Sequence, residues 1–108
     1  MQKYKWKNIN KWEQLKLDCP KLYAEDMYFE VPEDWFEDIK ELSFQLEREI
    51  ISNTKQFQDE CYAIQVKEKY GSLRFYMTME TDEMKALIEQ TIDKIYEYER
   101  KKTLQQNP

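Results

Sequence analysis

The fold is decided by the stretch Tyr62-Ala63-Ile64-Gln65-Val66-Lys67-Glu68-Lys69-Tyr70-Gly71-Ser72-Leu73-Arg74-Phe75-Tyr76-Met77. Hydrophobic residues recur with a period of two on both sides of the segment Tyr70-Gly71-Ser72, which predicts a β-hairpin. Gly71 is the only glycine of the chain, and it stands where the chain must reverse and a positive φ is needed.

The alternation predicts an apolar face and a polar face for this hairpin. The apolar face, which is expected to rest on helices, contains Tyr62, Ile64, Val66, Leu73, Phe75, Met77 and Met79. The polar face contains Gln65, Lys67, Arg74, Tyr76 and Thr78. Pairing of Glu68 with Arg74 or a neighbouring lysine across the strands would stabilise such a sheet.

Apolar residues at helical spacing predict three helices around the hairpin. The first covers residues 8–18, with Asn8 or Asn10 as its cap, and ends before Pro20. The second starts at Pro32, ends near Asn53 and carries the apolar stripe Trp35, Ile39, Leu42, Leu46 and Ile50. The third, capped by Thr81 or Asp82, buries Met84, Leu87, Ile88, Ile92, Ile95 and Tyr98. Residues 28–31 are predicted to form a short edge strand.

The order of these elements predicts a small α+β domain, α-α-β-β-α, with a central antiparallel hairpin packed on helices. The chain has 108 residues, of which 41% are hydrophobic and 15% aromatic, which is enough for one small core. We expect a single domain over residues 1–108, with its core in 8–102 and a flexible tail in 103–108.

The composition argues against most catalytic chemistry. The chain has no histidine, so His-based triads and His metal ligands are excluded. A phosphate-binding glycine loop cannot be built from one glycine, and Cys19 and Cys61 alone cannot form a structural zinc site. We therefore expect no enzyme, cofactor or metal site. With no apolar run long enough for a membrane span and no secretory segment, we expect a cytoplasmic protein with reduced thiols and no membrane partner.

Charge is unevenly distributed along the chain, whose net charge is −5. Residues 1–24 carry six lysines and two acids, whereas residues 25–60 carry twelve acids and three basic residues. The main acidic candidates are Glu33, Asp34, Glu37, Asp38 and Glu41, several of which share one helix face at spacings of three and four. Such a face attracts cationic surfaces, but carboxylates also suit the solvated first turn of a helix.

The segment Val66-Lys67-Glu68-Lys69-Tyr70-Gly71-Ser72-Leu73-Arg74-Phe75-Tyr76 resembles a family of small uncharacterised phage and prophage proteins. Their signature is Val-Lys-Glu-Lys-Phe-Gly-Gly-Leu-Arg-Phe-Tyr, and the resemblance extends over residues 20–95. Many members end in a Cys-x-x-Cys-Gly knuckle, where this chain has Tyr96-Glu97-Tyr98-Glu99-Arg100, so no metal role is implied. The resemblance implies an origin in a mobile element and no particular chemistry.

Two functions are weighed on this basis. In the preferred one, a non-enzymatic phage-type inhibitor blocks a basic nucleic-acid-binding surface of a host protein, such as a nuclease or a CRISPR effector. The acidic candidates would supply the charge, and Tyr28 and Tyr76 would anchor the complex. In the alternative, a small nucleic-acid-binding accessory protein uses the hairpin residues Lys67, Lys69, Arg74 and Tyr76. A metal-dependent hydrolase using the carboxylates and a homodimer paired through exposed aromatics are further hypotheses.

Overall fold

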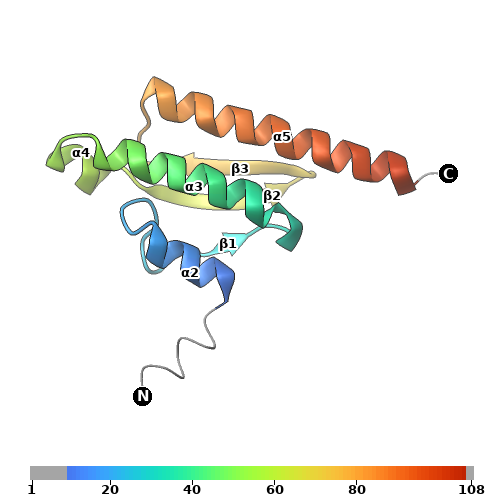
Figure 1. Cartoon of the computed structure of the whole chain (residues 1–108), viewed down its shortest axis with the longest axis horizontal. Coiled ribbons are helices and arrows are strands. Elements are labelled where there is room, and N and C mark those ends of the chain that lie inside the picture. Colours follow the sequence, from blue (N-terminus) through green and yellow to red (C-terminus); the bar gives the residue numbers. More distant parts are fainter. Residues whose placement is uncertain (1–9, 107–108) are drawn as a thin grey trace, which may run out of the picture.

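A computed structural model describes residues 10–106, which form a small α+β domain with a three-stranded sheet (Figure 1). Its helices are α2 (Lys11–Asp18), α3 (Phe36–Ile51), α4 (Lys55–Glu60) and α5 (Asp82–Gln106), and the 3-10 turn η1 (Glu33–Trp35) precedes α3. Its strands are β1 (Phe29–Glu30), β2 (Ala63–Lys69) and β3 (Ser72–Met77). The predicted fold class, the hairpin and the short edge strand are confirmed.

The sheet has the order β1-β2-β3 and is mixed. Strand β1 runs parallel to β2, with Phe29 opposite Val66, whereas β2 and β3 form the antiparallel hairpin. Parallel neighbours need a crossover connection, and here α3 and α4 supply it between β1 and β2. The parallel pairing of β1 was not part of the sequence-based prediction.

The hairpin turn has a positive φ at two successive residues, 56° at Tyr70 and 76° at Gly71. This is the pattern of a type I′ turn, whose twist matches that of the flanking strands. The prediction for Gly71 is confirmed. Tyr70 is the exceptional residue, because a bulky side chain in the left-handed region is strained. The Glu68 carboxylate accepts the N–H of Gly71 at 2.7 Å and holds the turn from one side.

The prediction of an apolar face on β2 is wrong for the first half of the strand. A β-bulge interrupts the register between Ala63 and Gln65, so that Ala63 and Val66 are buried while Ile64 is exposed. A bulge inserts one extra residue and shifts the following side chains to the other face. Tyr62 is consequently also exposed, on the side that the alternation assigned to solvent-facing polar residues.

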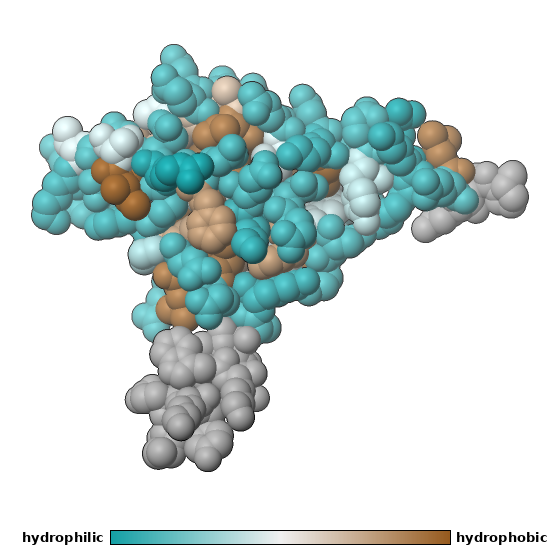
Figure 2. Space-filling view, viewed as in Figure 1, coloured by the Kyte–Doolittle hydropathy of each residue, from teal (hydrophilic) through white to brown (hydrophobic). Residues whose placement is uncertain are grey.

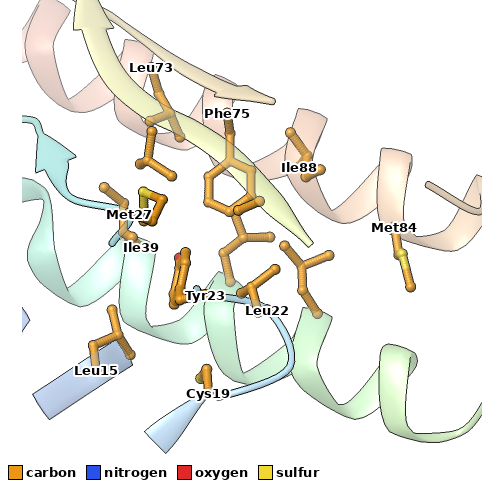
Figure 3. Packing of buried hydrophobic residues seen from close by; sticks show 14 of the residues in the cluster. Leu15, Cys19, Leu22, Tyr23, Met27, Ile39, Leu73, Phe75, Met84 and Ile88 are labelled. Carbon is orange, nitrogen blue, oxygen red and sulfur yellow. The ribbon is translucent and has the colours of Figure 1, made fainter. Parts of the chain in front are cut away.

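The core lies between the inner face of the hairpin and the helices (Figure 3). The predicted stripe of α3 is confirmed, since all five of its members are at most 1% exposed: Trp35, Ile39, Leu42, Leu46 and Ile50. Leu73 and Phe75 of β3 meet Ile88 of α5 in this cluster. Phe36, which lies off the stripe, is covered by Trp12 of α2 at a ring-centroid distance of 4.8 Å.

The segment between α2 and β1 is fastened to the core by buried polar groups. The Glu47 carboxylate of α3 accepts the backbone N–H groups of Lys21 at 3.1 Å and Leu22 at 2.8 Å. Close by, the Tyr23 and Ser43 hydroxyls are 2.6 Å apart, and Ser43 donates to the carbonyl of Ile39. These bonds place the segment along β2, where the N–H of Ala63 donates to the carbonyl of Leu22 at 2.8 Å.

The helix ends differ in part from the predicted ones. Asn10 caps α2 by accepting the N–H of Glu13 at 2.9 Å, and the alternative start at Asn8 lies outside the described residues. Helix α4, capped by Thr54, was not predicted. Helix α5 continues to Gln106, beyond the expected start of the tail, and its buried stripe includes Thr91 in place of Tyr98, which is exposed.

Candidate functional site

The outer face of the sheet is the candidate functional surface, because no described helix packs on it. Side chains reach it from all three strands and from the residues next to them. We call this surface the open sheet face and define it by Tyr28, Glu30, Tyr62, Ile64, Gln65, Lys67, Lys69, Arg74 and Tyr76. The exposed fractions of its four largest apolar members are high: 68% for Tyr28, 39% for Tyr62, 56% for Ile64 and 47% for Tyr76.

The strand register orders the basic and aromatic residues on this face. Lys67 lies opposite Arg74, and Gln65 lies opposite Tyr76. On the other side of β2, Lys67 is the register partner of Glu30. The face therefore has two cations at its centre and a tyrosine next to them, and Lys69 follows toward the turn. Its three basic residues outnumber its single carboxylate.

A second aromatic group lies at the opposite end of the open sheet face. Tyr28, Tyr62 and Ile64 line one shallow hollow together with residues of the segment before β1. Ile64 is there because of the bulge, which has no counterpart in the pattern of hydrophobic residues. The exposure of Tyr62 and Ile64 therefore differs from the predicted pattern, whereas all four residues of the predicted hairpin set lie on the sheet: Lys67, Lys69, Arg74 and Tyr76.

Ion pairs within the molecule neutralise part of the predicted acidic surface. Glu33 pairs with Lys11 of α2 at 2.8 Å, and the indole N–H of Trp12 also donates to it. Asp34 accepts the Lys102 ammonium at 2.9 Å and the Tyr98 hydroxyl at 2.8 Å, both from α5. These carboxylates thus tie α2 and α5 to the start of α3.

The remaining acidic candidates lie on α3 itself. Lys94 of α5 is 3.9 Å from Asp38 and 3.6 Å from Glu41. Among the described residues, Glu37 alone of the five acidic candidates has no ion-pair partner. Figure 2 shows the α3 side of the molecule as largely hydrophilic, with hydrophobic residues in small separate groups. This side therefore carries acids and lysines together and is not a purely negative surface.

The ion pairs and hydrogen bonds on this side shift the pKa values of the groups that form them. Hydrogen bonds from Lys102 and then from Tyr98 lower the pKa of Asp34, and the same contact raises the pKa of Tyr98. Hydrogen bonds from Lys11 and Trp12 lower the pKa of Glu33. The lowered pKa values of Asp34 and Glu33 favour their charged carboxylates at neutral pH, as a structural ion pair requires, and the raised pKa of Tyr98 keeps its hydroxyl protonated as the donor.

The two tyrosines expected to anchor an acidic interface belong to the open sheet face instead. Tyr28 precedes β1 and Tyr76 lies on β3, whereas the acidic candidates lie on η1 and α3. The structure therefore groups Tyr28 and Tyr76 with the basic hairpin residues. The aromatic residues Tyr4 and Trp6 lie outside the described part of the chain.

Within residues 10–106 the potential metal ligands are dispersed and both thiols are buried. The described residues contain no group of three or more potential metal-ligating side chains close enough to share an ion. Burial, together with the carboxylates of Glu47 and Asp18, raises the pKa of Cys19 to about 12, so this thiol is protonated. Burial also raises the pKa of Cys61, and both cysteines are free. The arrangement of the open sheet face supports binding through charge and aromatic stacking.

Comparison with known proteins adds no relative. No family model matches the chain, and no curated protein or solved structure matches it either. The resemblance to phage proteins stays a prediction. Among the described helices, none combines the length and apolar character that crossing a membrane requires.

Proposed function

We propose that this chain is a non-enzymatic binding protein whose open sheet face holds single-stranded nucleic acid. The observation that carries the proposal is the strand register, which sets Lys67 opposite Arg74 and places Tyr76 beside them. Proteins that bind single strands combine cationic groups for the phosphates with aromatic rings on which bases stack. An exposed sheet surface can present both to several nucleotides at once.

Each part of the face has a role in this proposal. Lys67, Arg74 and Lys69 neutralise successive phosphates along the hairpin. Tyr76 supplies the central stacking surface, since almost half of its side-chain surface is open to solvent. Tyr28 and Tyr62 receive the next bases at the far end, where they line a common hollow.

The net charge of −5 does not prevent such binding, because most of the acids lie away from the open sheet face. The exceptions are Glu30 beside Lys67 and Asp26 at the hollow of Tyr28 and Tyr62. Four of the five acidic candidates are paired with lysines. Charges on the outer side of α3 are also separated from the open sheet face by the thickness of a helix, about 10 Å. The Debye length at physiological ionic strength is about 8 Å, so their repulsion is largely screened.

The test is fluorescence anisotropy of a labelled twelve-nucleotide oligothymidylate titrated with the whole chain at several salt concentrations. The proposal expects binding that weakens with salt. The double variant Lys67→Gln/Arg74→Gln should bind more weakly and lower the salt slope by about 1.4, since two phosphate contacts to a single strand are lost. The matched control Lys85→Gln/Lys101→Gln removes the same charge from exposed positions on α5 and should leave the slope unchanged. Equal slopes for both double variants would refute the proposal.

The second candidate is the phage-type inhibitor that binds a basic surface of a host protein through the acidic side. The exposed, unpaired Glu37 favours it, together with the high side-chain exposure of Glu33 (65%) and Glu41 (63%) among the described residues. Reversal of Glu37 to lysine, which breaks no ion pair of the described fold, should abolish capture of such a nuclease or CRISPR effector. Retained capture by Glu37→Lys would rule this candidate out.

A further inference from the structure

The tip of the hairpin presents an aromatic side chain that the fold does not use. Tyr70 is 88% exposed, and its only described ring contact is the Lys69 ammonium, 5.6 Å from the ring centroid. Its backbone is held in the left-handed region at a φ of 56°. Asn and Gly are the usual residues at such positions of a type I′ turn, because they adopt them with little strain.

A hollow lies beside this side chain, between the turn and the last turns of α5. It has a volume of about 310 Å³ and is lined by Tyr70, Gly71, Tyr96, Glu99, Arg100, Thr103 and Leu104. Such a volume is at the lower end of the range of pockets that hold small organic ligands. Tyr96 and Leu104 are exposed in the described structure, and the rim carries Arg100, which is paired with Glu97 at 2.9 Å. The carboxylate of Glu99 also lines the hollow.

The hollow lies beyond the turn at the end of the open sheet face, on the side where α5 runs. Lys69, at the end of β2, directly precedes Tyr70 and is the register partner of Ser72 on β3. Tyr76 lies four residues beyond Ser72 along β3, and at about 3.3 Å per residue these four steps span about 13 Å. A strand stacked on Tyr76 and neutralised by Arg74 and Lys67 therefore reaches the turn within a few nucleotides.

We infer that Tyr70 is a base-stacking residue, and that the hollow beside it takes one unpaired nucleobase of a strand bound along the hairpin. This inference rests on the proposed function and names a further part of the same site. The base lies against the Tyr70 ring, with Tyr96 as the opposite wall and Arg100 near the adjoining phosphate. Asparagine would fit this turn with less strain, but it provides no stacking surface. The stacking role therefore explains why a tyrosine occupies the position.

The test compares Tyr70→Asn, Tyr70→Phe and Tyr96→Ala with the wild type by oligothymidylate anisotropy and by thermal unfolding. Tyr70→Asn should raise the melting temperature while weakening binding of the twelve-nucleotide strand about five- to 100-fold, since one stacked base is lost. Tyr70→Phe keeps the ring and should match the wild type in both measurements. Tyr96→Ala should weaken binding without raising the melting temperature.

The outcomes separate this inference from the proposed function. If wild type binds and Tyr70→Asn binds equally well, Tyr70 has no part in the site and the inference is wrong, although the open sheet face still binds. If wild type does not bind any oligonucleotide at low salt, both are wrong.

Discussion

Lys67 and Arg74 are register partners across the hairpin, and both lie on the face of the sheet that no described helix covers. Two like charges opposite each other destabilise a sheet, so this pairing is unfavourable for folding alone. On the neighbouring strand, Glu30 relieves only part of the repulsion. An anionic ligand along the hairpin would relieve the rest, which is why this pair is central to the proposed function.

Replacement of Glu47 by alanine is predicted to destabilise the fold by about 2–3 kcal/mol, because one buried and one partly buried N–H group lose their acceptor. These are the backbone groups of Leu22 and Lys21, which donate to the two oxygens of the Glu47 carboxylate. Urea unfolding followed by circular dichroism measures the change. Glu41→Ala, which removes an exposed carboxylate from the same helix, should cost less than about 0.5 kcal/mol. Equal losses for the two variants would argue against an anchoring role for Glu47.

The contact of Asp34 with Lys102 and Tyr98 predicts a pH-dependent stability. The pKa of Asp34 is lowered in the folded chain, so its contribution is complete above the ordinary pKa of about 3.9 and is lost as the pH falls through the lower folded value. Asp34→Asn should therefore lower the free energy of unfolding at pH 7, by less than about 1 kcal/mol for so exposed a pair, and the loss should shrink as the pH falls below about 3.9.

Glu37→Gln is the control for Asp34→Asn, since Glu37 has no ion pair within residues 10–106. It should leave the free energy of unfolding at pH 7 unchanged. A loss for Asp34→Asn that does not shrink as the pH falls would mean that the side chain acts through packing and not through its charge.

Both cysteines are predicted to resist alkylation in the folded state. Cys19 and Cys61 are fully buried, and burial is the main cause of their raised pKa values. A thiol-reactive dye at pH 8 should therefore label neither residue in buffer and both in guanidinium chloride. Rapid labelling of one thiol in buffer would show local opening of the segment that contains it.

Gly71→Ala is predicted to destabilise the hairpin by about 1–2 kcal/mol, the cost of the left-handed conformation for a residue with a Cβ. No atom lies within 4 Å of the position of the new Cβ, so no steric clash adds to this cost. Thermal unfolding measures the effect. A loss well above this range would point to a second role for Gly71 beyond its backbone conformation.

The sequence predicted the elements whose signals are local. The stripe from Trp35 to Ile50 and the glycine turn follow from periodicity and from the φ requirement of Gly71. The exposure of Ile64 was missed, because a bulge shifts the side-chain alternation without changing the residues that alternate. Helix α4 was missed because its six residues include one hydrophobic residue, Phe57, and therefore show no periodicity.

Whether the surroundings of a candidate residue can be predicted from the sequence depends on how far away along the chain its partners lie. The carboxylates near Asp34 form a compact acidic run in the sequence, but the lysine that neutralises Asp34 is 68 residues away. Long-range partners of this kind depend on how α5 packs on α3, which no local pattern encodes. The basic residues of the hairpin were grouped correctly because they are neighbours across a turn of two residues, so sequence proximity and spatial proximity coincide.

Binding along the open sheet face is tested most directly by an NMR titration of the isotope-labelled whole chain with the twelve-nucleotide oligothymidylate. We expect amide signals to shift in residues 28–30, in β2 and β3 and at Tyr70, while those of η1 and the first half of α3 stay in place. Shifts confined to residues 33–41, or no shifts at low salt, would show that the open sheet face does not bind the strand.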